Sequence, residues 1–232
     1  MRLMTNCNFY KYPCSPPPSL LSTAPKWRRP PHPLPAHGAI TPAPPLPPPG
    51  RERPGGAMEA LYFAYGSNLL RERLLLGSAA SPCGTARLPD FKLDFGHHQG
   101  RTSPVWHGGT ATIVQSPGDE VWGVVWKMNT SNLSSLDKQE GVADGIYVPI
   151  EINVHTPAGK VLTCRSYQMR DYVRGPPSPQ YKKVICMGAK QNGLPTEYQK
   201  KLEAIETNNY AGPVPIFEEI EAAVKASKAN FA

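Results

Sequence analysis

The composition of the chain changes abruptly at Met58, and this change limits which part can build a packed core. Residues 1–57 contain 16 of the 28 prolines in the chain. Proline lacks a backbone N–H donor and fixes its own φ, so a segment this rich in proline stays extended and solvated. The sequence therefore predicts a disordered proline-rich leader at residues 1–57 and one folded domain at residues 58–232.

The positive charge of the chain belongs to the same leader. Seven Lys or Arg residues and one acidic residue give the leader +6 of the total formal charge of +7. The remaining 175 residues are therefore nearly neutral. A basic chain indicates nucleic-acid binding only when its basic residues cluster on a folded surface. We therefore expect no nucleic-acid partner.

Other features of the composition exclude several classes of protein. No run of 18 apolar residues is present, so we expect no membrane-spanning helix. The five cysteines are odd in number, far apart and form no CxxC pair, which favours a reduced, cytosolic compartment over a disulfide framework. His97, His98 and His107 lack the spacing and the neighbouring acids or cysteines of a metal site, so we expect no metal.

The leader leaves one non-enzymatic alternative open. PxxP spacings at Pro42/Pro45 and Pro45/Pro48 could dock an aromatic-lined groove, which would make the chain an adaptor. The basic residues of the leader miss the register that usually accompanies such a motif, which favours a passive tail. Met58 directly precedes the first strand-like segment and could begin a shorter product.

The hydrophobic pattern after Met58 predicts more strand than helix. Strands are expected at residues 61–65, 110–115, 121–128, 148–155 and 160–169, with a turn at 116–120. Helices are expected at residues 68–76, 131–140, 195–205 and 217–228. Several strands with few helices between them predict a mixed α+β domain with a largely antiparallel sheet.

The stretch Tyr65-Gly66-Ser67-Asn68 is the first candidate for chemistry. Gly66 permits a tight turn after a strand, and Ser67 or Asn68 can begin a helix. Backbone N–H groups at such a junction have no internal acceptor and suit a carboxylate or an oxyanion. An ordinary capped strand–turn–helix explains the same four residues equally well.

Glu140 is the second candidate, because it falls at the end of a predicted helix. A carboxylate there faces the negative end of the helix dipole, which raises its pKa and suits a general base near neutral pH. A solvated surface glutamate is the alternative. Five tyrosines could line an amphipathic pocket or belong to the core: Tyr62, Tyr65, Tyr147, Tyr167 and Tyr181.

Together these segments resemble the γ-glutamylcyclotransferase family. The resemblance runs from about Leu61 to Ile205 and leaves the leader outside. It rests on long matching stretches: Tyr62–Leu69, Asp90–Gly96, Trp106–Gly109, Ser116–Asn129, Leu136–Val142 and Pro176–Ala189. Stretches of this length are far more specific than a short motif.

The resemblance implies a mixed, β-barrel-like sheet with flanking helices, a homodimer in the cytosol, and no cofactor. It implies conversion of a small-molecule γ-glutamyl amino acid to 5-oxoproline and a free amino acid, within glutathione and γ-glutamyl metabolism. The family's catalytic glutamate falls on Glu140. The implied substrate-binding residues are Tyr62, Phe63, Ala64, Tyr65, Gly66, Ser67, Asn68, Tyr147 and Tyr181.

The implied chemistry agrees with the residues. The substrate's own α-amino group attacks its γ-carbonyl, so the enzyme needs a base rather than a nucleophile, and Glu140 can take that proton. Substrate folding into a near-attack geometry would supply much of the rate. Related cyclotransferases acting on γ-glutamyl-lysine amines or on glutathione remain alternatives.

Overall fold

The computed structural model describes residues 58–229. The predicted disorder of residues 1–57 and their PxxP segments lie outside the described residues. None of the described helices is long and apolar enough to cross a membrane.

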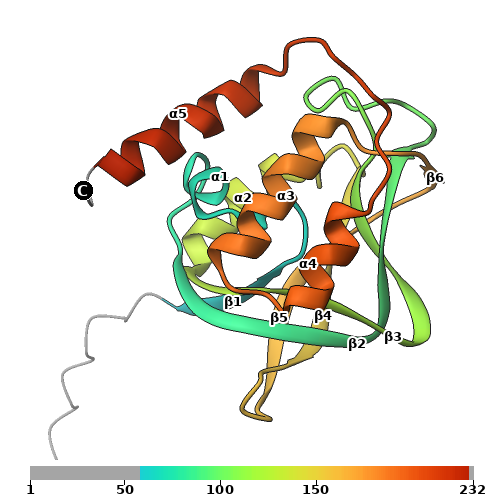
Figure 1. Ribbon diagram of the computed structural model, residues 1–232. Helices are drawn as coiled ribbons and strands as arrows, with labels where there is room; N and C mark the ends of the chain where they lie inside the picture. The colour runs from blue at the N-terminus through green and yellow to red at the C-terminus, as the bar shows by residue number, and fades with distance from the viewer. Residues whose placement is uncertain (1–57, 230–232) are drawn as a thin grey trace, which may run out of the picture. The chain divides into compact units, whose positions relative to one another are not determined.

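Five strands pair into a closed ring (Figure 1). They are β1 (Glu59–Ala64), β2 (Ser81–His98), β3 (Thr110–Asn129), β4 (Tyr147–His155) and β5 (Val161–Met169). The order is β3–β1–β5–β4–β2, and pairing of β2 with β3 closes the ring. Only β1 and β5 pair in parallel; the other neighbours are antiparallel. The prediction of a mixed α+β, barrel-like and largely antiparallel sheet is confirmed.

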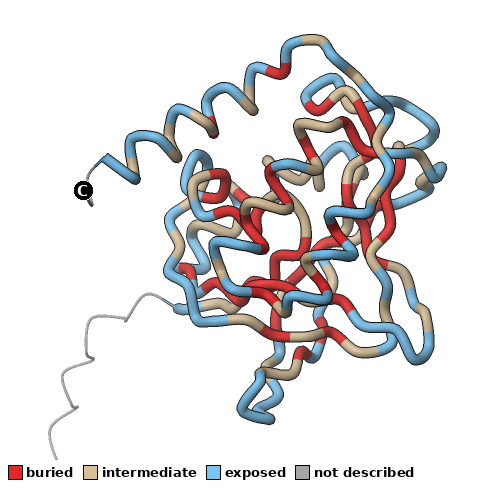
Figure 2. Tube along the Cα trace, in the orientation of Figure 1, coloured by how far each residue is buried: buried red, intermediate tan, exposed pale blue. Residues whose placement is uncertain are grey.

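Short strands and helices surround the ring. They are the 3₁₀ turns η1 (Ser67–Leu69) and η2 (Thr130–Asn132), α1 (Arg71–Leu75), α2 (Leu133–Gln139), β6 (Tyr172–Arg174), α3 (Pro179–Gln191), α4 (Thr196–Glu203) and α5 (Pro215–Ala229). In Figure 1, α3 and α4 lie side by side against one side of the barrel, and β6 extends the sheet at the end of β2. The helix α5 buries only Ile220 completely, and most of it is exposed or half-buried (Figure 2).

The core lies inside the ring and beneath α3. Apolar residues at alternate positions of the strands point inward, as the two-residue period of a strand requires, and Phe63 and Trp126 are completely buried there. Gly188 lets α3 approach the η1 segment closely, because a Cβ at this position would lie 2.4 Å from the backbone nitrogen of Leu70. This close contact positions α3 over the end of β1.

Two local predictions were wrong, and two elements were not predicted. Residues 116–120 do not reverse the chain, because they form a bulge within β3 opposite Asp90, whose carboxylate accepts from the backbone N–H of Gly118 at 2.9 Å. The helix expected at 68–76 is broken at Leu70, which is extended with φ −80° and ψ 123°, so that only η1 and the short α1 form. The long strand β2 and the helix α3 were not predicted.

Candidate active site

A small cavity of about 30 Å³ lies where the end of β1 meets α2, α3 and the first residues of β3 and β4. Ten residues line it: Tyr62, Tyr65, Gly66, Ser67, Asn68, Ala111, Glu140, Tyr147, Tyr167 and Tyr181. The structure therefore brings together eight of the predicted site residues from three separate parts of the sequence, residues 62–68, 140–147 and 181. A space of this size holds a group as small as a carboxylate or one or two waters.

Glu140 is the only carboxylate in this lining. It ends α2, and its backbone N–H donates to the carbonyl of Leu136 at 2.9 Å. Gly141 follows with φ +64°, a left-handed conformation that favours glycine and turns the chain away from the helix axis. The helix end therefore places the half-buried Glu140 side chain in the cavity.

Two amide side chains hold one oxygen of Glu140. Asn68 Nδ2 donates to Oε1 at 3.2 Å, and Gln139 Nε2 donates to the same atom at 3.4 Å. Gln139 Nε2 also donates to Oδ1 of Asn68 at 3.0 Å, so the two amides fix each other. Within the described residues no group donates to Oε2, which leaves this oxygen open to a ligand.

Burial raises the pKa of the Glu140 carboxyl from its ordinary value of 4.5 to about 7. The positive charge of Arg73 and the hydrogen bonds from Gln139 and Asn68 oppose this rise, while the charge of Asp137 adds to it. Desolvation disfavours the ionised form, and these donors restore part of its stability. A carboxylate with a pKa near 7 can both accept and return a proton at neutral pH.

The tyrosines form the walls of the cavity as neutral hydroxyl groups. Burial raises the pKa of Tyr62, Tyr65 and Tyr147 well above the ordinary value of 10, and that of Tyr181 to about 12. These phenols therefore stay protonated near neutral pH and act as hydrogen-bonding groups, not as bases. The hydroxyl of Tyr62 accepts from Asn68 at 3.1 Å and keeps its own proton available for a ligand.

Ala111 is held on both sides by tyrosine hydroxyls. Its backbone N–H donates to the hydroxyl of Tyr181 at 3.1 Å, and its carbonyl accepts from the hydroxyl of Tyr147 at 2.7 Å. Gly66 packs against the same group, because a Cβ on Gly66 would lie 3.2 Å from both the Ala111 Cβ and the Tyr181 hydroxyl. A side chain at residue 66 would therefore crowd Ala111 and Tyr181, and glycine lets the β1–η1 loop lie close to them.

The η1 turn has backbone donors without an acceptor in two residues that line the cavity, Ser67 and Asn68. The backbone N–H groups of Leu69 and Leu70 are satisfied by Gly66 and Ser67 carbonyls. The first N–H groups of a helical turn have no acceptor within it, and those of Ser67 and Asn68 donate to no other described residue. The loop that was predicted to bind an anion thus has the backbone donors for that role. The helix that follows it is shorter than expected.

The cavity opens into a cleft of about 560 Å³. Ser67, Glu140, Tyr147 and Tyr181 line both spaces. The segment between β2 and β3 (residues 99–109) forms much of the outer wall of the cleft, and Trp106 from that segment packs against Tyr181 with ring centroids 4.8 Å apart. The cleft is large enough for a dipeptide-sized molecule whose reacting end reaches Glu140.

Two predicted binding residues lie elsewhere. Phe63 and Ala64 are completely buried and line neither the cavity nor the cleft. Phe63 alternates with Tyr62 along β1, and its ring packs near Gly123 of β3, where a Cβ would lie 2.6 Å from it. The side chains of these two residues therefore belong to the core beneath the site.

Three polar residues at the site were not predicted from the sequence. Gln139 holds Glu140, Arg73 from α1 lines the cleft, and the hydroxyl of Thr110 is 2.9 Å from that of Tyr147. The position of Gln139 next to Glu140 was the one feature of the sequence that could have indicated its role. Nothing in the local pattern around Arg73 distinguished it from a surface arginine.

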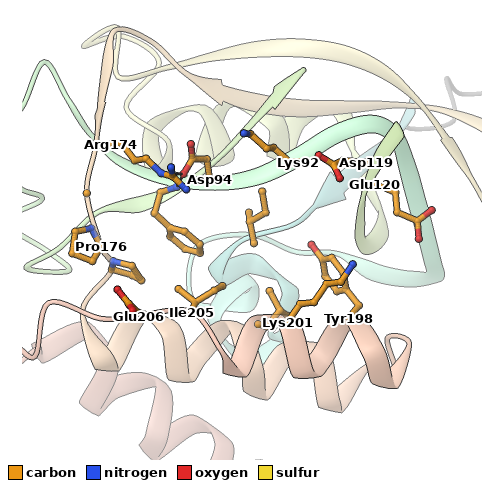
Figure 3. A pocket seen from close by; sticks show the side chains of 15 residues that line it. Lys92, Asp94, Asp119, Glu120, Arg174, Pro176, Tyr198, Lys201, Ile205 and Glu206 are labelled. Atoms are coloured by element: carbon orange, nitrogen blue, oxygen red, sulfur yellow. Dashed lines mark hydrogen bonds and ion pairs between the residues drawn. The ribbon is translucent and has the colours of Figure 1, made fainter. Parts of the chain in front are cut away.

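A second cavity, of about 690 Å³, lies between β2 and α4 (Figure 3). Its buried carboxylate, Asp94, already accepts from Tyr172 at 3.0 Å and from Arg174 Nε at 3.0 Å. Its other acids, Asp119, Glu120 and Glu206, are exposed. The second cavity therefore lacks an unpaired buried acid or base. Among the described residues no group of three or more His, Cys, Asp or Glu side chains is arranged to hold a metal ion.

Comparisons with known proteins give one consistent result. A family model described as the AIG2-like family matches residues 120–202. A bovine protein named gamma-glutamylcyclotransferase is 68% identical over 171 residues, covering 73% of this chain and 90% of its own length. A human protein of the same name is 68% identical over 167 residues, covering 71% of this chain and 87% of its own length.

A solved structure agrees with these sequence matches. A chain named gamma-glutamyl cyclotransferase superimposes with a TM-score of 0.70 at 65% identity, covering 73% of this chain and 99% of its own length.

Proposed function

The chain belongs to the γ-glutamylcyclotransferase family, and we propose that Glu140 is the base with which it converts a γ-glutamyl amino acid into 5-oxoproline and a free amino acid. The observation that carries this assignment is the Glu140 carboxylate itself. It lies in the cavity with one oxygen held by two amides, the other open, and its pKa raised to about 7.

The reaction is an intramolecular transfer of the acyl group. The α-nitrogen of the glutamyl residue forms a bond to its own γ-carbonyl carbon, and the amide bond from that carbon to the leaving nitrogen breaks. Two protons move from the α-nitrogen to the departing nitrogen, one before the attack and one as the ring closes, and Glu140 carries each of them in turn. The lactam then keeps one N–H, the amino acid leaves with an ammonium group, no water is consumed and no proton is released. Tethering of the nucleophile to its target supplies a large effective concentration.

The β1–η1 loop supports this role through its backbone. The N–H groups of Ser67 and Asn68 and the hydroxyl of Tyr62 are donors without an acceptor among the described residues. We assign them to the glutamyl α-carboxylate and to the negative charge that develops on the γ-carbonyl oxygen. Loss of one such oxyanion donor costs about 3 kcal/mol in other acyl-transfer enzymes.

Tyr147 and Tyr181 shape the other wall of this pocket. The hydroxyl of Tyr147 donates to the Ala111 carbonyl, and the hydroxyl of Tyr181 accepts from the Ala111 N–H. We assign their rings the role of excluding water around the folded substrate. Tyr65 is held in the same way, since its hydroxyl donates to the carbonyl of Tyr167.

The direct test is product analysis with the purified full chain. Incubation with γ-glutamyl-alanine should release 5-oxoproline and alanine in equal amounts. Formation of glutamate and alanine instead would show hydrolysis and would contradict the cyclisation. Glutathione and γ-glutamyl-ε-lysine in parallel reactions separate the related activities, and faster turnover of either one would reassign the substrate.

The assembly and location of the protein are also proposals. The family resemblance supports a homodimer in the cytosol that acts in γ-glutamyl metabolism without a cofactor. Light scattering on the purified chain would give twice the monomer mass if it dimerises. Fractionation of cells expressing the full chain tests the compartment, and recovery in a membrane or organelle fraction would contradict it.

A further inference from the structure

Arg73 is a charged residue in the wall of the active-site cleft that the cyclisation chemistry above does not use. It lies on α1, only 9% of its surface is exposed, and it lines the same cleft as Glu140. Charged side chains are rarely buried to this extent without a partner that satisfies them.

The guanidinium of Arg73 is satisfied along one edge only. Nη1 donates to Oε1 of Gln139 at 3.2 Å. The Nε–H is buried and has no acceptor, and no hydrogen bond among the described residues uses Nη2. The Nε–H and one Nη2–H lie on the same edge of the planar group. Nε is covered by protein, so Nη2 is the donor of this edge that a carboxylate oxygen can reach.

Aromatic packing holds this edge in place. The guanidinium carbon of Arg73 lies 5.9 Å from the centroid of Trp106, and Trp106 in turn packs on Tyr181. Tyr181 lines both the small cavity and the cleft. Arg73, Trp106, Tyr181 and Glu140 therefore line one cleft.

The position of Arg73 decides which substrate carboxylate it can meet. Arg73 lines the cleft but not the small cavity, where the β1–η1 loop supplies donors for the glutamyl end. We propose that the unpaired edge of Arg73 binds the carboxylate of the leaving amino acid and thereby selects γ-glutamyl amino acids over γ-glutamyl amides and amines. This inference rests on the proposed cyclisation.

Other cations in the cleft are less suited to this role. Lys138 and Arg101 also line it, but both are exposed, so water screens their charge. A buried donor that finds no acceptor until substrate binds rejects a substrate lacking that acceptor far more strongly than a surface charge does.

The test compares γ-glutamyl-alanine with γ-glutamyl-alaninamide. The two differ only in the carboxylate, which becomes a neutral amide of the same shape. Rates of 5-oxoproline release are measured at pH 8.5, where Glu140 is ionised. We expect the unchanged chain to favour γ-glutamyl-alanine by about 100-fold in kcat/KM. A ratio near 1 would overturn the proposal without touching the cyclisation, whereas no 5-oxoproline from either substrate would overturn the cyclisation itself.

Variants then assign the preference to Arg73. Arg73→Met should lower kcat/KM for γ-glutamyl-alanine about 100-fold, mostly through KM, and should bring the ratio of the two substrates near 1. Arg73→Lys, which keeps the charge without the fork, should give an intermediate ratio. Arg71→Met, on the exposed neighbour two positions away, is the matched control and should leave the ratio unchanged.

A purely structural role predicts a different pattern. If Arg73 only orients Gln139, both substrates lose rate by the same factor in Arg73→Met and their ratio stays at its original value, which would contradict the proposal. Thermal melting of each variant shows whether it folds. Arg73→Lys keeps the comparison available if Arg73→Met does not fold.

Discussion

The side-chain amide of Asn68 donates a 3.2 Å hydrogen bond to Oε1 of Glu140, joining the loop after β1 to the end of α2. The same amide nitrogen reaches the Tyr62 hydroxyl at 3.1 Å. Asn68 thus holds both the proposed base and a hydroxyl of the cavity wall in place.

Replacement of the base should abolish turnover without unfolding the protein. Glu140→Gln keeps the size of the side chain and the oxygen that accepts from Asn68, but it cannot take a proton. We expect kcat for 5-oxoproline release to fall by at least about 10³-fold. Glu197→Gln, an exposed change on α4, is the control and should keep full activity. Near-normal turnover by Glu140→Gln would contradict the assignment of the base.

The rate should depend on the ionisation of Glu140. Because the pKa of this carboxyl is raised to about 7, the ionised base is scarce at pH 6 and abundant at pH 8. We therefore expect kcat/KM to rise with pH and to reach half of its plateau near pH 7. A profile of kcat/KM that is already flat at pH 5 would show that the base is a carboxylate with an ordinary pKa or is not a carboxylate.

Loss of the Asn68 amide should shift that profile. The hydrogen bond from Asn68 lowers the pKa of Glu140, so its removal in Asn68→Ala raises that pKa further. The rising limb of kcat/KM should move to higher pH, and the rate at pH 7 should fall roughly 10-fold or more. An unchanged limb with a lower plateau would show that Asn68 binds substrate but does not tune the base.

The raised pKa of Glu140 should also lower the stability of the folded protein. The carboxyl binds its proton more tightly in the folded state (pKa about 7) than in the unfolded state (ordinary value 4.5). Its effect on the free energy of unfolding is therefore absent below about pH 4.5, and stability falls as pH rises to 7. Glu140→Gln should stabilise the protein by up to about 3 kcal/mol at pH 8 and by little at pH 4.5.

Melting temperatures at the two pH values check this sign. The exposed Glu197→Gln serves again as the control, since its ion pair with Lys200 lies at the surface and contributes little. Equal stabilisation by Glu140→Gln at pH 4.5 and pH 8 would point to a packing effect, not to ionisation.

The sequence predicted the elements that form from local pattern. The apolar run at 61–65 became β1, and the helix before Glu140 formed at nearly the expected place. The alternation of 148–155 and the return strand at 160–169 were also confirmed as β4 and β5. The expected helix at 68–76 did not form as one helix, because Leu70 is completely buried in an extended conformation. Tertiary packing sets this conformation, and helix propensity does not predict it.

The elements missed were those whose pattern is interrupted. Pro82 and Pro89 obscure the long strand β2, which tolerates them at irregular points of its register with β3. Pro176 and Pro177 precede α3, and with Pro179 they give the sequence the pattern of a loop. Pro179 is the first residue of the helix, where proline is accepted. Ser178 caps this helix by accepting from the backbone N–H of Tyr181 at 3.2 Å.

The site residues that could not be predicted are those that only the closed ring brings into contact. Arg73 and Trp106 are 33 positions apart and belong to segments with no shared motif, yet the fold stacks one on the other. Phe63 and Ala64 stay predictions, because the structure places only their side chains away from the cavity. A resemblance assigns a whole loop to the substrate, whereas strand alternation directs some of its side chains into the core.

The two oxygens of Glu140 differ in their contacts, and this difference restricts the stereochemistry of the proposed reaction. Oε1 is anchored by Asn68 and Gln139, so the carboxylate cannot rotate during turnover without breaking both contacts. If Oε2 alone carries the proton, the attacking and departing nitrogens must both face that one atom, on the same side of the tetrahedral carbon. The enzyme then admits a single handedness of ring closure, and a γ-glutamyl compound of inverted α-carbon would present its amine to the wrong face.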